Sequence, residues 1–366
     1  MTQIKWSYLD RKFPPEVRKK IFSKLDDVVA RGDFTLGREV EEFEEAWAAK
    51  VGVRYAIGVG NGTDALKLSL LAVGIKPGDE VIVPASTFIA TAGAVCEVGA
   101  VPVFVDVDNN LCIDAEKIES AITPKTKAIM PVVWSGRMPD MKRICDIADR
   151  NSLFLIEDAA QGIMSEYKGF KAGTFGHLSA FSLHPLKNVS GWGDGGVIVT
   201  NNIEYAKWLK LYRNHGLIGR NTIAITGCNS RLDTVQAVVN KYVLDQIDWI
   251  TERRIANAAF LDSELSKIPQ VTLSARFSDR KFTFTQYENF YDNRDGLQAF
   301  LKDNGIESLV HYPMPCYLNK PFGRKLGDFP VSDWQAANKL SLPCHEHLTQ
   351  DELDYIADKV RKYYAA

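Results

Sequence analysis

Hydrophobic positions between residues 50 and 200 follow a repeated alternation of two patterns. Short continuous apolar runs end in Gly, Pro, Asp or Ser, and stretches with helical periodicity follow them. Apolar runs separated by helices are typical of strands that are buried on both faces of a largely parallel sheet. The pattern predicts seven strands, at residues 55–59, 80–84, 101–107, 128–133, 153–158, 178–183 and 195–200.

The pattern changes on either side of this alternation. Residues 15–50 have helical periodicity with an acidic amphipathic end, and a long helical pattern runs from Thr234 to about Lys267. The last hundred residues mix short strands with helices. We therefore expect an α/β fold with a large domain, residues 1–250, built on a mainly parallel seven-stranded sheet flanked by helices. A smaller α+β domain would follow at residues 251–366, and the N-terminal segment can pack on it.

Composition and charge narrow the class of protein. The 366 residues carry a formal net charge of -2, so no general basic field would attract nucleic acid or an anionic membrane. Six cysteines are scattered without a C-x-x-C pair, which is typical of reduced thiols in a cytoplasmic protein. We expect neither a signal peptide nor a membrane span, since no apolar run approaches the necessary length.

Ligands of open α/β sheets bind beyond the carboxyl ends of the strands, and the first two such ends are suggestive. After residues 55–59, Asn61 and Gly62 form a turn and Thr63 opens a helix. A helix N-terminus binds phosphate, although Asn61 or Thr63 could simply cap the helix. After residues 80–84, Phe88 could stack on a planar cofactor or pack as a core residue.

Two further strand ends carry titratable groups. The strand at 153–158 ends in Glu157 and Asp158, one of which must lie near the crevice. A carboxylate there could keep a ring nitrogen protonated, cap a helix or bind a metal, and Gln161 lies one turn further on. Lys187 follows the strand at 178–183, between Pro185 and a glycine-rich return. A lysine in partly apolar surroundings has a lowered pKa and can form a Schiff base, whereas most lysines are solvated surface charges.

Other motifs contribute little. Cys344, His345 and His347 resemble metal ligands, but no second pair with suitable spacing accompanies them, so we expect no metal site. The chain contains no G-x-S-x-G elbow, no P-loop lysine motif and no G-x-G-x-x-G that opens a helix.

Taken together, the segments resemble the DegT/DnrJ/EryC1/StrS family of sugar aminotransferases, whose fold is that of the aspartate aminotransferases (fold type I). The resemblance extends from about Ala30 to the C-terminal helix. The matching runs are NGTDAL, VPASTFIATA, GAVPVFVDVD, KTKAIMPV, IEDAAQG, GTFG, FSLHPLKN, GDGGVIVT, RNHG, CNSRLD, YPMPCY and LSLPCH.

The resemblance implies a role for each matching position. It implies that Lys187 bonds covalently to pyridoxal 5'-phosphate and shuttles a proton, while Asp158 pairs with the pyridinium nitrogen. Gln161 would contact the ring hydroxyl and Phe88 would stack on the ring. The phosphate would be held by Gly62, Thr63 and Ser182, and by Asn229 from the neighbouring subunit of a homodimer with shared active sites.

The implied reaction is a ping-pong transamination. An amino-acid donor, usually glutamate in the family, would leave the cofactor as pyridoxamine 5'-phosphate, and a keto sugar would then take the amino group. A nucleotide-linked keto sugar is the family expectation, and a keto-octulosonate or a keto-cyclitol are alternatives. Candidate substrate contacts are Arg137, His184, His311 and Tyr312.

Some positions depart from the family pattern. Many members have H-L-Y-G-Q where this chain has Val133-Trp134-Ser135-Gly136-Arg137. Arg137 could bind a carboxylate or phosphate, or form a structural salt bridge. His184 could assist proton transfer or pack beneath the loop.

Three competing hypotheses remain. Relatives that use the cofactor for dehydration have a histidine at the lysine position, so Lys187 favours transamination. A non-catalytic regulatory relative is disfavoured by the full set of Lys187, Asp158, Gln161 and Ser182. A nucleotide-binding α/β protein is disfavoured by the missing glycine fingerprint.

Overall fold

The computed structural model describes residues 3–365 of the chain. Three helices precede the first strand: α1 (Leu9–Lys12), α2 (Pro15–Arg31) and α3 (Arg38–Val51). Proline at the start of α2 presets φ where no N–H is needed, and Gly32 ends the helix in the left-handed conformation that glycine adopts at little cost. The helix α3 buries Val40, Phe43 and Trp47 on one face and so packs on the body of the molecule.

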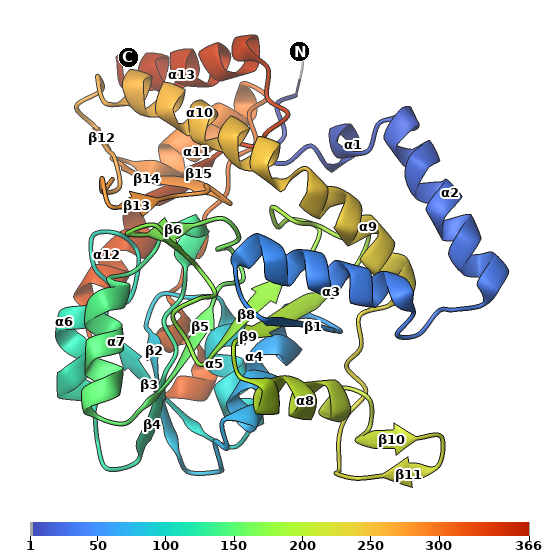
Figure 1. Ribbon diagram of the computed structural model, residues 1–366. Coiled ribbons are helices and arrows are strands. Elements are labelled where there is room, and N and C mark those ends of the chain that lie inside the picture. The colour runs from blue at the N-terminus through green and yellow to red at the C-terminus, as the bar shows by residue number, and fades with distance from the viewer. Residues whose placement is uncertain (1–2, 366) are drawn as a thin grey trace.

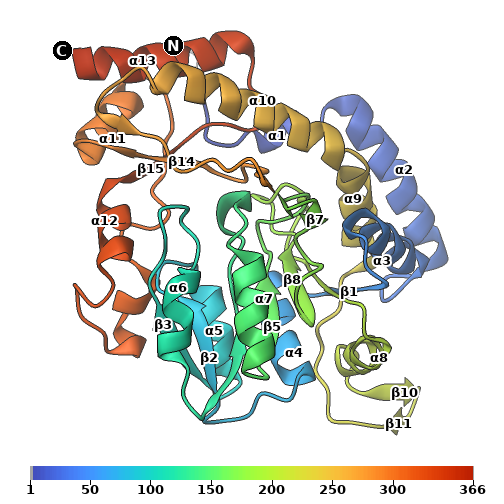
Figure 2. The ribbon, with the colours of Figure 1, turned by 60° about the vertical axis from the view of Figure 1, so that its left-hand side comes forward.

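A seven-stranded sheet forms the centre of the larger part of the molecule (Figure 1, Figure 2). Its strand order is β1–β9–β8–β5–β4–β2–β3, and neighbouring strands are parallel except in the two pairs that include β9. The predicted mainly parallel seven-stranded sheet is therefore confirmed. The strands are β1 (Tyr55–Val59), β2 (Glu80–Pro84), β3 (Val101–Val105), β4 (Thr126–Ile129), β5 (Phe154–Asp158), β8 (Leu178–Ser182) and β9 (Gly196–Thr200).

Two strands end two or more residues before the apolar runs that predicted them. The run at 101–107 forms β3 only as far as Val105, and the run at 128–133 leaves β4 after Ile129. Pro131 has no N–H to donate to a ladder, so the regular strand cannot continue past it. Loops therefore follow β3 and β4 at the carboxyl edge of the sheet.

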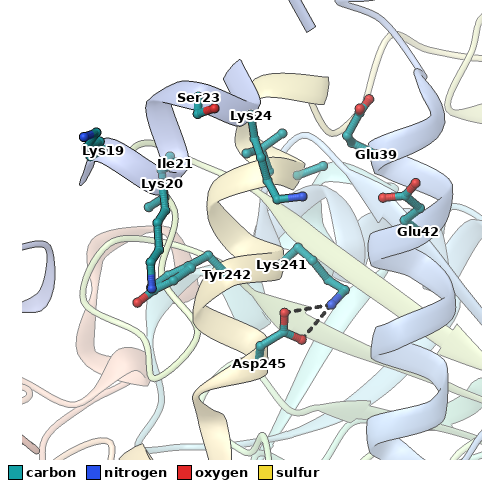
Figure 3. A pocket seen from close by; sticks show the side chains of 12 residues that line it. Lys19, Lys20, Ile21, Ser23, Lys24, Glu39, Glu42, Lys241, Tyr242 and Asp245 are labelled. Carbon is teal, nitrogen blue, oxygen red and sulfur yellow. Dashed lines mark hydrogen bonds and ion pairs between the residues drawn. The ribbon is translucent and has the colours of Figure 1, made fainter. Parts of the chain in front are cut away.

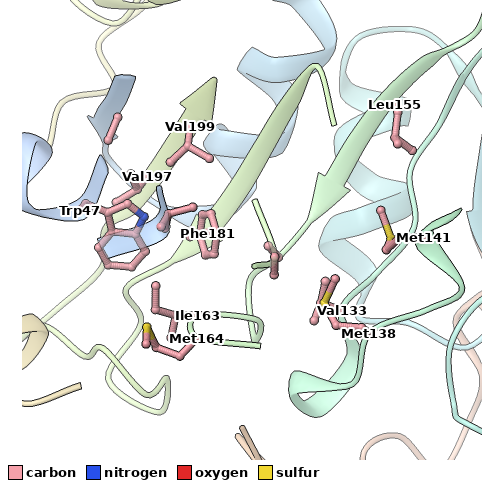
Figure 4. Packing of buried hydrophobic residues seen from close by; sticks show 14 of the residues in the cluster. Trp47, Val133, Met138, Met141, Leu155, Ile163, Met164, Phe181, Val197 and Val199 are labelled. Atoms are coloured by element: carbon pink, nitrogen blue, oxygen red, sulfur yellow. The ribbon is translucent and has the colours of Figure 1, made fainter. Parts of the chain in front are cut away.

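Helices cover both faces of the sheet. Alternate strand residues face opposite layers, so Ile82 packs on one side while Val81 and Val83 pack on the other. One layer contains α4 (Gly62–Ala72), α5 (Ile89–Glu97) and α8 (Ile203–Tyr212), and the other contains α3, α6 (Ala115–Ile118), α7 (Met141–Arg150) and α9 (Thr234–Asp245). Figure 4 shows the second layer, where Trp47 meets Phe181 edge to face at 5.3 Å.

The single long helix expected from Thr234 to about Lys267 is interrupted. It consists of α9 and α10 (Ile247–Leu265), and Gln246 between them has φ of -98° and ψ of 1°. The two helices pack on different neighbours. Helix α9 packs on α2 and α3, whereas α10 packs on the C-terminal helix α13 (Gln350–Ala365). The bend at Gln246 lets each apolar face reach its own partner.

A second body lies at the top of Figure 1 and encloses its own apolar cluster. It contains α10, α11 (Arg294–Asp303), α13 (Gln350–Ala365) and the antiparallel sheet of β12 (Val271–Thr272), β14 (Tyr287–Tyr291) and β15 (Lys339–Leu342). Ile4 and Tyr8 join this cluster, and the Ile4 N–H donates to the Gly305 carbonyl at 2.8 Å. We propose that these elements form the smaller domain that begins near residue 250.

No helix among residues 3–365 combines the length and apolar character needed to cross a bilayer.

Short elements complete the fold. The remaining strands are β6 (Glu166–Tyr167), β7 (Phe170–Lys171), β10 (Leu217–Gly219), β11 (Thr222–Ile223) and β13 (Arg280–Lys281), and the remaining helices are α12 (Pro330–Asn338) and the 3-10 turns at Glu119–Ala121, Trp134–Gly136, Cys316–Leu318 and Lys320–Phe322. The hairpin β10–β11 projects from the body (Figure 1).

Candidate active site

The four strand ends that carry candidate chemistry meet at one edge of the sheet. Strands β1, β2, β5 and β8 share one direction, so the segments that follow them lie at the same carboxyl edge. Gly62, Phe88, Asp158 and Lys187 belong to these segments. The topology thus brings together residues that are up to 125 positions apart in the sequence.

Lys187 lies in a tight turn directly after β8. Its backbone N–H donates to the His184 carbonyl at 2.8 Å, which closes the turn around Pro185. Desolvation by the surrounding side chains lowers the pKa of the Lys187 amine from 10.5 to about 8, and the Asp158 carboxylate opposes this effect. A substantial fraction of the amine is therefore neutral near pH 8, and only a neutral amine can attack a carbonyl carbon.

Asp158 is the acid at the crevice. It is buried, its Oδ2 accepts a hydrogen bond from the Thr91 hydroxyl at 2.7 Å, and its Oδ1 accepts one from the Ala160 N–H at 3.2 Å. Burial raises the pKa of Asp158, while these two hydrogen bonds and the Lys187 charge act in the opposite direction. A cationic ring nitrogen in this place would favour the carboxylate further.

The neighbouring Glu157 faces the opposite side of β5, as the alternation of a strand requires. Its carboxylate is fully buried and accepts N–H groups from Gly173, Phe175 and Gly176 and the hydroxyl of Ser179. Glu157 therefore holds the loop before β8 and does not face the crevice.

The start of α4 forms a cradle against β8. Asn61 caps the helix by accepting the Asp64 N–H at 2.8 Å, and the N–H groups of Gly62 and Thr63 lie in the first turn, where no intrahelical acceptor exists. A Cβ on Gly62 would lie 2.9 Å from the Ser182 Cβ, so only glycine lets the helix start approach Ser182 this closely. Free N–H groups, a helix dipole and a hydroxyl at one point suit a phosphate.

The loop with Asn229 lies beside this cradle. The Ser230 hydroxyl donates to the Asp64 carboxylate at 2.7 Å, and Asn229 forms a backbone bridge with Asn214. Asn229 itself is exposed. Its side chain is thus open to solvent.

An aromatic group borders the crevice. Phe88 is 48% exposed at the start of α5, and its ring centroid lies 5.7 Å from that of Tyr312. Tyr312 in turn lies 6.0 Å from Trp134. Burial raises the pKa of Tyr312 to about 12, and burial lowers the pKa of His311, which also experiences the charge of Lys187. The structure therefore brings His311 and Tyr312 of the C-terminal part to the same site.

Gln161 is buried at the inner side of the site. Its side-chain oxygen accepts the Ser135 N–H at 2.5 Å, and its backbone carbonyl accepts the Thr285 hydroxyl at 2.9 Å. The Ser135 contact fixes the orientation of the side-chain amide, and the Thr285 contact holds the backbone of Gln161.

Arg137 and His184 have partners within the protein. Arg137 is fully buried, and its guanidinium donates to the Ser274 hydroxyl at 2.6 Å and to the Glu288 carbonyl at 3.0 Å. Burial lowers the pKa of Arg137 to about 10. The Nδ1 of His184 accepts the Leu186 N–H at 3.2 Å and so braces the turn before Lys187. The Arg137 guanidinium thus donates to uncharged oxygens and not to a carboxylate, and His184 is exposed and not packed beneath the loop.

Sequence reasoning missed the residues that support the site. The hydroxyl of Thr91 could have been suspected, because it follows Phe88 by one helical turn among small polar residues. Glu288 and Lys339 offered no such signal, since they come from strands more than 120 residues beyond Asp158.

A groove on the surface lies away from the candidate site. It has a volume of about 610 Å³ and lies between α2, α3 and α9, where Lys241 pairs with Asp245 at 2.6 Å (Figure 3). None of the candidate site residues lines it. Within residues 3–365, no three His, Cys, Asp or Glu side chains are grouped so that they could hold a metal ion.

The chain is similar to a known family, to curated proteins and to solved structures. The model of the DegT/DnrJ/EryC1/StrS aminotransferase family matches residues 15–361. The chain is 39% identical to the "Pleiotropic regulatory protein" of Geobacillus stearothermophilus over 95% of both chains. It is 37% identical to the dTDP-3-amino-3,4,6-trideoxy-alpha-D-glucose transaminase of Streptomyces venezuelae, over 95% of this chain and 93% of the relative. The crystal structure of S. venezuelae DesV in complex with a ketimine intermediate superposes over 100% of both chains with a TM-score of 0.97 and 35% identity.

Proposed function

Because the chain belongs to the DegT/DnrJ/EryC1/StrS aminotransferase family and is a pyridoxal-phosphate-dependent transaminase, we propose that it aminates a nucleotide-linked keto sugar. The observation that carries the proposal is that Lys187, whose pKa is lowered to about 8, and the buried acid Asp158 lie at the same carboxyl edge of the sheet and influence each other's charge. An amino acid, in the simplest case L-glutamate, donates the amino group in a first half-reaction, and the keto sugar accepts it in a second.

The residues present fit the cofactor. When bound, pyridoxal phosphate supplies an electron sink conjugated to the carbon that gains or loses the amino group. Lys187 would attach the cofactor and move the proton, and Asp158 would keep a proton on the ring nitrogen. Phe88 would stack on the ring, and Gln161 would donate to the ring hydroxyl.

The phosphate belongs in the cradle of Gly62, Thr63 and Ser182. The absence of a Cβ at Gly62 and the free N–H groups of the first turn of α4 support this assignment. Asn229 completes the cradle from the neighbouring subunit of a homodimer. Its exposure, and the exposure of Ile218 and Ile223 at 65% each on the nearby hairpin, support a contact with a second chain.

The sugar class rests on the relatives. The S. venezuelae relative is named for a dTDP-linked amino sugar, which supports a nucleotide-linked keto sugar as the acceptor. The name of the Geobacillus relative raises the regulatory alternative. The complete set of Lys187, Asp158, Gln161 and Ser182 favours turnover, because a regulatory protein has no need for an amine of lowered pKa.

The visible absorption spectrum of the purified protein tests the proposal. We expect a yellow protein whose band bleaches with L-glutamate and returns when a nucleotide-linked keto sugar is added. Borohydride reduction followed by peptide mapping should place the label on Lys187. Lys187→Arg should remain folded and lose the band, whereas the exposed Lys125→Arg should keep it.

A protein that binds pyridoxal phosphate at Lys187 but does not respond to any amino donor would support the regulatory alternative. A band that responds to L-glutamate but to no nucleotide-linked sugar would direct the search to keto-octulosonates and keto-cyclitols. A wild-type protein that takes up no pyridoxal phosphate would overturn the assignment of the site.

A further inference from the structure

A buried carboxylate lies behind the site, on a strand of the C-terminal part. Glu288 of β14 has 0% of its surface exposed. Its Oε2 accepts two short hydrogen bonds, from the Trp134 indole N–H at 2.6 Å and from the Ser135 hydroxyl at 2.6 Å. Both donors belong to the turn Trp134–Gly136, which follows β4 in the larger part of the molecule. One carboxylate therefore joins the two parts of the chain.

The charge of Glu288 is balanced within the protein. The Lys339 Nζ lies 3.8 Å from Glu288 Oε1 and 5.0 Å from the centre of the Trp134 ring, and Lys339 is 1% exposed. Desolvation of such a pair is costly, and proteins in which apolar residues of similar size replace a buried ion pair are often equally stable or more stable. Stability alone therefore does not account for this pair.

The turn that Glu288 holds has an unfavourable backbone conformation. Ser135 has φ of 55°, in the left-handed region, and Gly136 follows with φ of 84°. A Cβ on Gly136 would lie 2.4 Å from the Thr283 hydroxyl oxygen. A left-handed residue other than glycine persists only where its surroundings fix it, and the contacts of Ser135 with Glu288 and Gln286 do so.

The consequence of this conformation is the direction of one N–H group. The Ser135 N–H donates to the side-chain oxygen of Gln161 at 2.5 Å. A backbone N–H can only donate, so it identifies the oxygen of the Gln161 amide and leaves the NH2 group free on the other side. Gln161 then offers donors, and no acceptor, to a group that lies in the site.

We propose that Glu288 is a positioning residue for Gln161. Through Ser135 and Trp134 it holds the turn Trp134–Gly136 so that the Gln161 amide donates a hydrogen bond to the ring oxygen of the cofactor. This inference rests on the proposed function, because it assigns the free amide donors of Gln161 to bound pyridoxal phosphate.

Two substitutions test the link. Ser135→Ala removes one hydroxyl and keeps the N–H. Glu288→Gln keeps the shape and one accepting oxygen but removes the negative charge that strengthens both hydrogen bonds to Oε2. Glu166→Gln is the matched control, since Glu166 is half-buried, pairs with Lys281 at 3.5 Å and has no contact with Gln161. The readouts are the dissociation constant of the cofactor-free protein for pyridoxal phosphate and the midpoint pH of the visible band of the lysine-bound cofactor.

A hydrogen bond donated to the ring oxygen favours the deprotonated form of the cofactor, so its loss raises the midpoint pH. We expect a rise of about one pH unit in Glu288→Gln and a smaller rise in Ser135→Ala. Cofactor affinity should fall by about tenfold in Glu288→Gln, in keeping with a hydrogen bond to a charged group. The double variant should shift no further than Glu288→Gln alone, because both residues act through one turn.

Midpoints and affinities equal to those of Glu166→Gln would overturn the inference, and so would additive shifts in the double variant. If Glu288→Gln does not fold, Ser135→Ala decides the question by itself. A wild-type protein without a visible band would instead count against the proposed function and leave no midpoint to compare.

Discussion

At the scale of single residues, burial sets the chemistry of the site. The same desolvation lowers the pKa of Lys187 to about 8 and raises that of Asp158, so both groups are moved toward their neutral forms. Hydrogen bonds from Thr91 and Ala160 then favour the carboxylate. The site therefore contains a reactive amine next to an acid that a cationic ring would keep ionised.

Desolvation of the Lys187 amine lowers the free energy of unfolding by an amount that depends on pH. In the cofactor-free protein at pH 7, the amine is protonated in both the folded and the unfolded chain, so its desolvation cost is fully present. As the pH rises from about 8 to 10.5, the folded chain releases the proton first, and wild-type stability gains relative to a variant without the amine. Lys187→Met should thus be more stable than wild type by about 3 kcal/mol at pH 7, with a difference that shrinks above pH 8.

Thermal unfolding of the cofactor-free proteins between pH 6 and pH 10 measures this difference. The exposed Lys125→Met serves as the control and should show no such trend. A constant difference between Lys187→Met and wild type across this range would mean that the amine is not desolvated.

The two adjacent acids of β5 should separate chemistry from stability. Asp158→Asn keeps the shape but cannot hold the ring proton, so bleaching of the band by L-glutamate should slow by about 10²–10³-fold with little loss of stability. Glu157→Gln leaves at least one N–H of the loop before β8 without its acceptor and should lower the melting temperature instead. Stopped-flow absorbance and thermal unfolding distinguish the two, and the reverse pattern would exchange the two roles.

The positions of single residues were predictable where they depend on the nearest strand alone. Lys187, Asp158, Gly62 and Phe88 follow apolar runs whose ends could be located in the sequence. The contact of Glu288 with Ser135 was not predictable, because it depends on the packing of two separate sheets.

At the scale of elements, the site depends on where helices and strands end. The seven strands could be predicted because parallel strands buried on both faces give continuous apolar runs. The break at Gln246 could not, since the helical periodicity continues through it and only the choice between two cores decides the bend. The turn Trp134–Gly136 was equally hidden, because no local signal requires a left-handed serine.

The start of α4 can be probed by comparing two glycines. A Cβ at Gly62 would lie 2.9 Å from the Ser182 Cβ, whereas a Cβ at Gly93 in α5 would meet nothing within 4 Å. Gly62→Ala should displace the helix start, reduce stability by about 1–3 kcal/mol and weaken phosphate-dependent cofactor binding. Gly93→Ala should stabilise the protein by up to about 1 kcal/mol through helix propensity.

Thermal unfolding and titration with pyridoxal phosphate measure both effects. Equal behaviour of the two variants would show that α4 and β8 can separate without harm to the cradle.

At the scale of the whole molecule, the site is a joint product of distant parts of one chain and, in our proposal, of two chains. In our proposal the large sheet supplies Lys187 as the attachment point of the cofactor, and the C-terminal part supplies His311, Tyr312 and Glu288. The sequence alone indicated two bodies. It could not show that Glu288 of the smaller body contacts Trp134 and Ser135 next to the site.

Subunit mixing tests the shared site. In a mixture of Lys187→Ala and Asn229→Ala subunits, each mixed dimer has one site with both native residues. After unfolding and refolding together, about a quarter of the sites should be intact if subunits combine at random. Activity should reappear in the mixture and in neither parent, and continued inactivity would indicate a site built within one chain.

The N-terminal segment has a consequence for synthesis of the chain. Trp6 donates its backbone N–H to the Glu307 carboxylate, 301 residues away, and Ile4 pairs with Gly305. At ribosomal speeds of about 5–20 residues per second, residues 4–6 are synthesised roughly 15–60 seconds before their partners. Nascent chains arrested before residue 300 should therefore be cut by protease near residues 4–12, while released chains resist. Residues 4–6 would thus be made about 300 positions before the residues that fix them.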